Sequence, residues 1–163
     1  MAELWDAYDH TFSKIKDMTL QRGEPLPEGV YHLVCDIAVK HTDGSYLLMK
    51  RDFQKHCGGM WELTAGGSAL QGETPLACAD RELKEETGVT AANLEEIGRF
   101  VSDAHHALYV EYLCVTDCNK DSIVFQEGET IDYKWTDRNT LLKMNHQELV
   151  SDRMIALIKK LDL

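Results

Sequence analysis

The chain has 163 residues, of which 44% are hydrophobic and 28% charged, and its formal net charge is −11 at pH 7. This length suits one domain, residues 1–163, with a buried core, and a content of only three prolines and 11 glycines argues against a disordered chain. The negative charge argues against nucleic-acid and membrane partners, because both surfaces are themselves anionic, and no apolar run is long enough to span a bilayer.

The first segment, residues 3–20, alternates loosely between polar and apolar residue types. This alternation predicts a β-hairpin within an N-terminal extension, residues 1–27. Residues 31–39 then predict a strand whose apolar side chains share one face: Leu33, Cys35, Ile37 and Val39. A Thr-Asp-Gly turn at 42–44 and a returning strand at 46–51 follow.

The next predicted elements are a short strand, residues 61–64, and a helix, residues 74–87. Pro75 suits the first turn of a helix, and Gly88 is placed to end it. Apolar residues that recur at spacings of three and four predict the inward face of this helix: Leu76, Ala79 and Leu83.

Strand-like segments follow at residues 96–102, 108–115 and 130–135. An apolar stripe near the end of the chain predicts a closing helix: Val150, Met154, Leu157, Ile158 and Leu161. This order of strands, helix, strands and helix predicts an α/β fold in which a mixed sheet packs between helices, an α/β/α sandwich.

The five cysteines show no spacing typical of a disulfide framework or a zinc site: Cys35, Cys57, Cys78, Cys114 and Cys118. The acidic N-terminus shows no signal or transit peptide. Both observations favour reduced thiols in a cytoplasmic protein.

Three carboxylates of the predicted 74–87 helix, Glu82, Glu85 and Glu86, are spaced at i, i+3 and i+4 and therefore share one helical face. Like charges this close repel each other unless a cation relieves them, and Mg²⁺ and Mn²⁺ prefer carboxylate oxygens. The alternative is a solvated acidic face partnered by Arg81 and Lys84.

The sequence around these glutamates separates the two alternatives. Residues 67–89 resemble the Nudix box, G-x5-E-x7-R-E-U-x-E-E-x-G-U with U aliphatic. Every fixed position matches: Gly67, Glu73, Arg81, Glu82, Leu83, Glu85, Glu86, Gly88 and Val89. A motif with this many fixed positions is far more specific than a lone glycine fingerprint.

The resemblance implies a Nudix-type fold and a MutT-like hydrolase that uses Mg²⁺ or Mn²⁺ to cut the diphosphate linkage of a nucleoside diphosphate derivative. It implies metal ligands at Glu82, Glu85, Glu86 and the backbone carbonyl of Gly67. It also implies roles for three residues that shape the motif: a structural ion pair between Glu73 and Arg81, and a helix end at Gly88.

A general base would take a proton from the attacking water. Some members of the family draw this base from the box helix, which here points to Glu85. Others draw it from a later loop, which here points to Glu129, with Glu127 as the second choice. The alternative for that loop is a solvated acidic segment without a catalytic role.

The chain also resembles the isopentenyl-diphosphate isomerase-like branch of the family. The similar segments include Glu3–Asp6, Tyr31–Leu33 and Gly59–Glu62. Isomerases of this branch have a catalytic cysteine just after the tryptophan strand, whereas Thr64–Gly67 contains none. Two other functions therefore stay as alternatives to the hydrolase: an isomerase of this branch and a non-catalytic nucleotide-binding module.

The main basic cluster ahead of the box comprises Lys50, Arg51, Lys55 and His56, and we expect Lys50 and Arg51 to bind substrate phosphates. The alternative is an exposed strand end and loop. We expect His105 and His106 to be loop residues, since neighbours on an extended chain point in opposite directions. Trp61 and Trp135 are expected to pack in the core. By family analogy, the N-terminal segment is a candidate arm of a homodimer.

Overall fold

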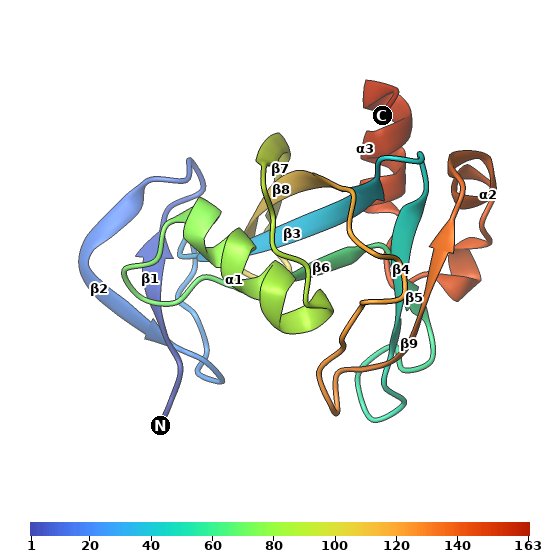
Figure 1. Ribbon diagram of the computed structural model, residues 1–163. Coiled ribbons are helices and arrows are strands. Elements are labelled where there is room, and N and C mark those ends of the chain that lie inside the picture. The colour runs from blue at the N-terminus through green and yellow to red at the C-terminus, as the bar shows by residue number, and fades with distance from the viewer.

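The computed structural model describes residues 1–163 and contains a two-stranded sheet, a seven-stranded mixed sheet and three α-helices (Figure 1). The strands are β1 (Leu4–Tyr8), β2 (Lys14–Gln21), β3 (His32–His41), β4 (Tyr46–Arg51), β5 (Trp61–Glu62), β6 (Thr64–Ser68), β7 (Leu94–Ser102), β8 (Ala107–Thr116) and β9 (Thr130–Thr136). The helices are α1 (Pro75–Thr87), α2 (Arg138–Leu142) and α3 (Arg153–Leu161), and a 3₁₀ turn spans His146–Glu148. The predicted mixed sheet and N-terminal hairpin are confirmed.

Helix α1 begins and ends where the sequence predicts. The hydroxyl of Thr74 accepts a hydrogen bond from the amide of Ala77 and caps the helix, and Pro75 occupies the first turn, where its missing N–H costs nothing. Gly88 ends the helix with a φ of 75°, a left-handed conformation that glycine adopts without a Cβ clash.

The inward face of α1 is shifted from the predicted one. Cys78, Ala79, Leu83 and Thr87 are buried, whereas Leu76 is 53% exposed. The prediction for Leu76 is wrong because the first turn of α1 is covered by no other element there. Leu76 instead borders a surface groove with Ala91 and Leu94.

Strand β3 lies at the centre of the molecule and is covered on both faces. Leu33, Cys35, Ile37 and Val39 share one face, as predicted, and pack with α1 residues in the main core cluster. The opposite face carries Ala38, which packs against Met154 and Ile158 of α3. The sheet therefore separates the α1 side from the α3 side (Figure 1).

The returning strand β4 forms where predicted, but it leaves β3 immediately. Lys40 and Tyr46 are the only paired residues of β3 and β4. Beyond this point β6 lies beside β3 and pairs with it in antiparallel orientation. The paired residues run from Val34 opposite Ser68 to Ala38 opposite Thr64. Strand β6 pairs with β3 alone, so its other edge is free to face the carboxylates of α1.

The N-terminal hairpin packs beside the start of the Nudix-like segment. A bridge between Tyr8 and Tyr31 joins it to the residue before β3. The carboxylate of Asp6 accepts a hydrogen bond from the amide of Gly72, and the carbonyl of Leu4 accepts one from Gln71. These contacts bring β1 to the rim of the candidate site.

The C-terminal region contains one predicted and one unpredicted helix. Met154 and Ile158 of α3 are buried as the stripe predicts, but Leu161 is exposed and Val150 precedes the helix. Helix α2 has only five residues, too few to show a helical period, and Asp137 caps it by accepting from the amide of Thr140. None of the helices is long and apolar enough to cross a bilayer.

Candidate active site

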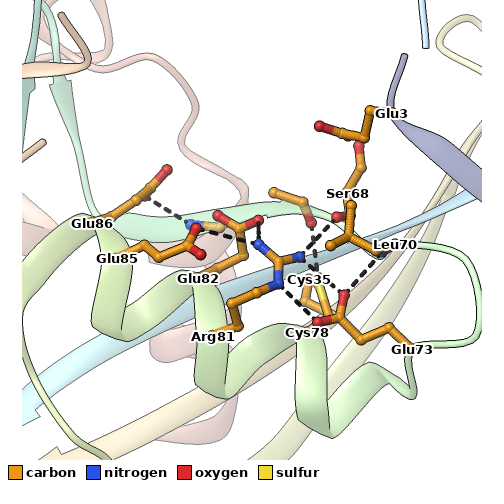
Figure 2. A network of polar contacts seen from close by, with 12 residues as sticks. Glu3, Cys35, Ser68, Leu70, Glu73, Cys78, Arg81, Glu82, Glu85 and Glu86 are labelled. Atoms are coloured by element: carbon orange, nitrogen blue, oxygen red, sulfur yellow. Dashed lines mark hydrogen bonds and ion pairs between the residues drawn. The ribbon is translucent and has the colours of Figure 1, made fainter. Parts of the chain in front are cut away.

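Arg81 joins the loop before α1 to the acidic face of that helix. Its Nε and Nη2 donate to the two carboxylate oxygens of Glu73 at 2.8 and 2.9 Å, and Nη2 also contacts the carbonyl oxygen of Ser68. Its Nη1 pairs with Glu82 at 2.6 Å and with Glu85 at 3.3 Å. Figure 2 shows this guanidinium between the carboxylates, so Arg81 fixes β6, the loop and α1 relative to one another.

The three glutamates of the box have different surroundings. The side chain of Glu85 is 49% exposed, whereas that of Glu82 is mostly buried against Arg81. Glu86 is partly buried, accepts a hydrogen bond from the amide of Gly66 at 3.0 Å, and forms no ion pair with a cationic side chain. Burial, partly offset by the Gly66 amide, raises the pKa of Glu86 to about 8.

A metal site is not preformed at these glutamates. No three His, Cys, Asp or Glu side chains converge closely enough to hold a metal ion as they stand. Arg81 forms ion pairs with Glu82 and Glu85, as the alternative of a solvated acidic face predicts. Lys84, the second cation of that alternative, forms no ion pair with these glutamates. The donor set nevertheless fits a hard divalent cation, because it offers only oxygen atoms and includes the partly buried carboxylate of Glu86, which has no ion-pair partner.

The backbone of β6 favours Gly66 over Gly67 as a carbonyl ligand. In an antiparallel strand, the N–H and C=O of one residue point to the same side, and those of the next residue point to the opposite side. The amide of Gly66 points to Glu86, whereas the carbonyl oxygen of Gly67 is in contact with the thiol of Cys78 in the core. The expectation for the Gly67 carbonyl is therefore replaced by one for Gly66.

Gly67 is still required by the geometry, for a different reason. A Cβ at this position would lie 2.5 Å from a carboxylate oxygen of Glu82, so the absence of a side chain lets that carboxylate lie against the strand. Gly67 thus sets the position of Glu82 rather than offering a ligand of its own.

Replacing Gly66 by alanine is expected to destabilise the protein by about 1–3 kcal/mol or to prevent folding. Its Cβ would lie 2.2 Å from the carbonyl oxygen of Cys35, a backbone atom that cannot move without breaking the pairing of β3 and β6. Urea unfolding followed by circular dichroism measures the effect. The same substitution at Gly98, whose Cβ would meet the flexible end of Leu157 at 3.0 Å, is expected to cost less. A Gly66 variant as stable as the parent would contradict the tight packing.

A cavity of about 440 Å³ lies over the free edge of β6, and we call it the glutamate cavity. Glu129 reaches it from the loop before β9 and is ion-paired there with Lys55. Glu127 does not line it and is exposed. The thirteen lining residues are Glu3, Trp5, Arg22, Lys55, Gly66, Gly67, Ser68, Arg81, Glu82, Glu85, Glu86, Gln126 and Glu129. Both candidates for the general base, Glu85 and Glu129, therefore face one space.

A second cavity, of about 570 Å³, opens on the α3 side of the sheet, and we call it the α3-side cleft. Gly66 and Gly67 line both cavities, so the two meet at β6. Arg51 and His56 of the predicted basic cluster line this cleft. Arg51 donates to the carboxylate of Glu62 at 3.3 Å, and its Nε is buried without a hydrogen-bond partner.

Lys50 is not brought to either cavity. Consecutive residues of a strand point to opposite faces, so Lys50 turns away from the cleft that Arg51 lines. Its ammonium group lies over the rings of Phe53 and Trp61, at 5.9 and 5.6 Å from their centroids. The predicted substrate contact of Lys50 therefore finds no support in this arrangement, in which its contacts are those of surface packing.

The expectations for the aromatic residues and the histidine pair agree with the structure. Trp61 and Trp135 pack against the core clusters. His105 and His106 lie in the turn between β7 and β8, where the ring of His106 contacts the carbonyl oxygen of Val30. His105 nevertheless reaches the rim of the α3-side cleft, which sequence reasoning did not foresee.

Sequence reasoning also missed residues that enter the cavities from distant parts of the chain. Trp5 and Arg22 of the hairpin line the glutamate cavity, and Asp36 and Arg153 line the α3-side cleft. Arg153 and Asp36 form an ion pair at 2.6 Å across a separation of 117 residues. The only signal in the sequence was the resemblance of the Glu3–Asp6 segment to the isomerase-like branch, and nothing marked Arg153.

Known proteins resemble this chain in sequence. The NUDIX domain model matches residues 30–157. An uncharacterised Nudix hydrolase of Listeria innocua is 32% identical over 141 residues, which cover 85% of this chain and 82% of that protein. The isopentenyl-diphosphate Delta-isomerase of Serratia proteamaculans is 35% identical over 78 residues, 47% of this chain and 43% of that protein. The isomerase likeness is thus confined to about half of the chain.

Solved structures share the fold. A Deinococcus radiodurans protein superposes with a TM-score of 0.76 at 16% identity, covering 96% of this chain and 98% of that one. The NUDIX domain of Shewanella oneidensis NrtR, complexed with ADP ribose, superposes with a TM-score of 0.64 at 20% identity, covering 82% and 89%. With the domain model spanning residues 30–157 and a Nudix hydrolase aligned over most of its length, this chain belongs to the Nudix hydrolase family.

Proposed function

We propose that the protein is a Mg²⁺- or Mn²⁺-dependent hydrolase that cuts the diphosphate linkage of a nucleoside diphosphate joined to another group. One observation carries the proposal: Glu82, Glu85 and Glu86 face the free edge of β6, and the partly buried Glu86 has no ion-pair partner. The ADP ribose bound by the related NUDIX domain supports the nucleoside diphosphate class.

The residues that would hold the cation are Glu82, Glu85 and Glu86, together with the carbonyl oxygen of Gly66. The bound cation would neutralise charge on the diphosphate and lower the pKa of a water molecule. Arg81 contacts both Glu82 and Glu85, so these two carboxylates exchange one cationic partner for another when the site is filled. The ion pair with Glu73 stays in place and keeps Arg81 on the loop.

Glu129 is the stronger candidate for the general base. A carboxylate that binds a cation is a weaker proton acceptor, which disfavours Glu85, whereas Glu129 comes from a separate loop and is not part of the ligand set. Its ion pair with Lys55 directs its carboxylate into the glutamate cavity. Glu129 would accept the proton of the attacking water as that water forms its bond to phosphorus.

Arg51→Ala is expected to raise KM about tenfold, the equivalent of one charged hydrogen bond to a phosphate. The guanidinium of Arg51 lines the α3-side cleft and keeps donors that Glu62 does not use. Steady-state kinetics of the purified variants measure the effect. Lys50→Ala is the matched control and should leave KM unchanged, because Lys50 lies on aromatic rings outside the cavities. Equal KM values for the parent and Arg51→Ala would remove Arg51 from the substrate site.

A panel of nucleoside diphosphate derivatives, assayed with Mg²⁺, with Mn²⁺ and with EDTA, tests the proposed function. Phosphorus NMR identifies the products. We expect turnover of at least one compound with either cation and none with EDTA. Binding of the panel compounds without turnover would instead indicate a nucleotide-binding module.

The partial likeness to an isopentenyl-diphosphate isomerase makes isomerisation the second activity to measure. Residues 61–68, which form β5 and β6, contain no cysteine, and Cys57 reaches only the α3-side cleft. Incubation with isopentenyl diphosphate, followed by proton NMR, should yield no dimethylallyl diphosphate. Conversion to that isomer would replace the hydrolase proposal.

We also propose that the binding partner is a small molecule. The net charge of −11 disfavours RNA, because RNA binding relies on a basic surface.

A homodimer with the N-terminal hairpin as its arm is proposed by family analogy. Light scattering coupled to gel filtration measures the oligomeric state.

A further inference from the structure

The turn before α1, residues 70–73, leaves two of its own amides unpaired. The amide of Glu73 donates to the carbonyl oxygen of Leu70 at 2.9 Å and closes the turn. Gly72 has a φ of 79°, a value typical of the third position of a type II turn, where glycine is favoured. The amides of the two middle residues, Gln71 and Gly72, find no acceptor within such a turn and need one elsewhere.

The N-terminal hairpin supplies both acceptors. The carbonyl oxygen of Leu4 accepts from the amide of Gln71 at 2.9 Å, and Oδ2 of Asp6 accepts from the amide of Gly72 at 2.8 Å. From β2, the hydroxyl of Thr19 accepts from the side-chain amide of Gln71 at 3.0 Å. The turn is therefore held at both middle residues by a segment that lies outside the part of the chain matched by the NUDIX domain model.

The turn connects the hairpin to the acidic face of α1 through Glu73 (Figure 2). The carboxylate of Glu73 accepts from the amide of Leu70 at 2.9 Å and binds Arg81 through two donors. Arg81 also pairs with Glu82 and Glu85, the carboxylates that a cation would take from it. A displaced turn would loosen Glu73 from Arg81, and the guanidinium would then be free to compete with the cation for both glutamates.

A second contact of the hairpin reaches the same guanidinium from the side of β6. The ring of Trp5 in β1 stacks on the ring of His32, with centroids 4.2 Å apart and an angle of 15° between the planes. Nδ1 of His32 lies 3.2 Å from the hydroxyl of Ser68, and the carbonyl oxygen of Ser68 accepts from Nη2 of Arg81 at 3.3 Å. The hairpin thus supports two partners of Arg81, Glu73 and Ser68, that lie outside the helix.

We propose that the N-terminal hairpin positions Arg81 for metal binding, and that Asp6 is a positioning residue of the metal site, acting through the amide of Gly72. This inference rests on the proposed hydrolase function, because it concerns the affinity of the same glutamates for a cation. Asp6 lines neither cavity, so it acts through the turn and not by contact with the substrate. Within the hairpin its carboxylate is ion-paired with Lys14 at 2.8 Å.

Replacing Asp6 by alanine tests the inference through the affinity for Mn²⁺. Electron paramagnetic resonance measures the Kd of parent and variant, and urea denaturation measures their free energies of unfolding. We expect the Kd to rise at least about fivefold, the lower end of the coupling between two linked sites, while kcat at saturating Mn²⁺ stays close to that of the parent. A role in stability alone would lower the free energy of unfolding and leave the Kd of the folded protein unchanged, and that result would overturn the inference.

Two matched variants separate the hydrogen bond to Gly72 from the charge of Asp6. Asp6→Asn keeps an oxygen that accepts from the Gly72 amide but loses the ion pair with Lys14. Lys14→Ala removes the same ion pair and leaves the acceptor in place. Both variants are expected to bind Mn²⁺ as the parent does. If Lys14→Ala weakened binding as much as Asp6→Ala, the effect would belong to the ion pair and the role given to the turn would be contradicted.

Gln71→Pro is the deciding variant if Asp6→Ala does not fold. Proline suits the second position of a type II turn and removes the amide that donates to Leu4, so it cuts a contact with the hairpin without changing the hairpin itself. We expect weaker Mn²⁺ binding here too, and an affinity equal to that of the parent would contradict the inference. A parent that neither binds Mn²⁺ nor hydrolyses any diphosphate would overturn the hydrolase proposal itself, whereas parent-like binding in every variant would overturn the role of the hairpin alone.

Discussion

Replacing Glu86 by glutamine is expected to lower kcat at least about a hundredfold while the protein stays folded. Glutamine keeps the shape of the side chain and still accepts the hydrogen bond of the Gly66 amide, but it brings no charge to a cation. The rate of diphosphate cleavage at saturating Mg²⁺ measures the loss. Glu127→Gln is the matched control, because Glu127 is exposed and lies outside the glutamate cavity.

The same substitution is expected to leave the free energy of unfolding at pH 7 unchanged or to increase it. Burial raises the pKa of Glu86 to about 8, above its ordinary value near 4.5, so the folded protein holds the proton more tightly than the unfolded chain. Its ionisation therefore costs stability as the pH rises from about 4.5 to 8, and glutamine removes that cost. Activity like that of the parent would exclude Glu86 from the catalytic site, whereas loss of folding would leave Glu82→Gln as the variant to assay.

Replacing Arg81 by alanine is expected to reduce the free energy of unfolding by about 3 kcal/mol and kcat at least tenfold. Removal of the Arg81 side chain leaves the carboxylates of Glu73 and Glu82 without a counter-charge. Both carboxylates are more than four-fifths buried, with exposures of 14% and 13%. The loop before α1 also loses its contact with the carbonyl oxygen of Ser68. Chemical denaturation gives the stability, and the same hydrolysis assay gives the rate.

Two comparisons separate this effect from the general loss of a positive charge. Arg81→Lys keeps the charge but loses the two-pronged contact with Glu73, so an intermediate loss is expected. Arg99→Ala breaks an exposed pair with Glu96, which should cost no more than about 1 kcal/mol. Equal stabilities of the Arg81 and Arg99 variants would contradict the structural role given to Arg81.

Local signals predicted the elements that carry the box. The Pro75 start, the Gly88 end and the spacing of the glutamates are properties of neighbouring residues, and the structure has α1 at Pro75–Thr87. Leu76 was placed wrongly because a helical period gives a face but not the extent of the neighbouring elements that cover it. The five-residue α2 was missed because its length is shorter than the window in which a period can be recognised.

The arrangement of the site depended on contacts that a single sequence does not encode locally. The register between β3 and β6 decides whether the carbonyl of Gly66 or that of Gly67 faces the glutamates, and the motif does not contain this information. Arg51 and Lys50 were grouped by charge, but strand alternation sends them to different surroundings. The pairing of Asp36 with Arg153 joins the central strand to the last helix, and only the folded chain brings them together.

The most direct test of the metal-dependent hydrolase is the binding of Mn²⁺, measured by electron paramagnetic resonance on the parent protein and on a Glu82→Gln, Glu86→Gln double variant. Our expectation is that the parent binds Mn²⁺, that Mg²⁺ competes for the same site, and that the double variant binds at least about tenfold more weakly. Equal Mn²⁺ affinity in the two proteins, or an absence of binding by a parent that still hydrolyses diphosphates, would contradict it.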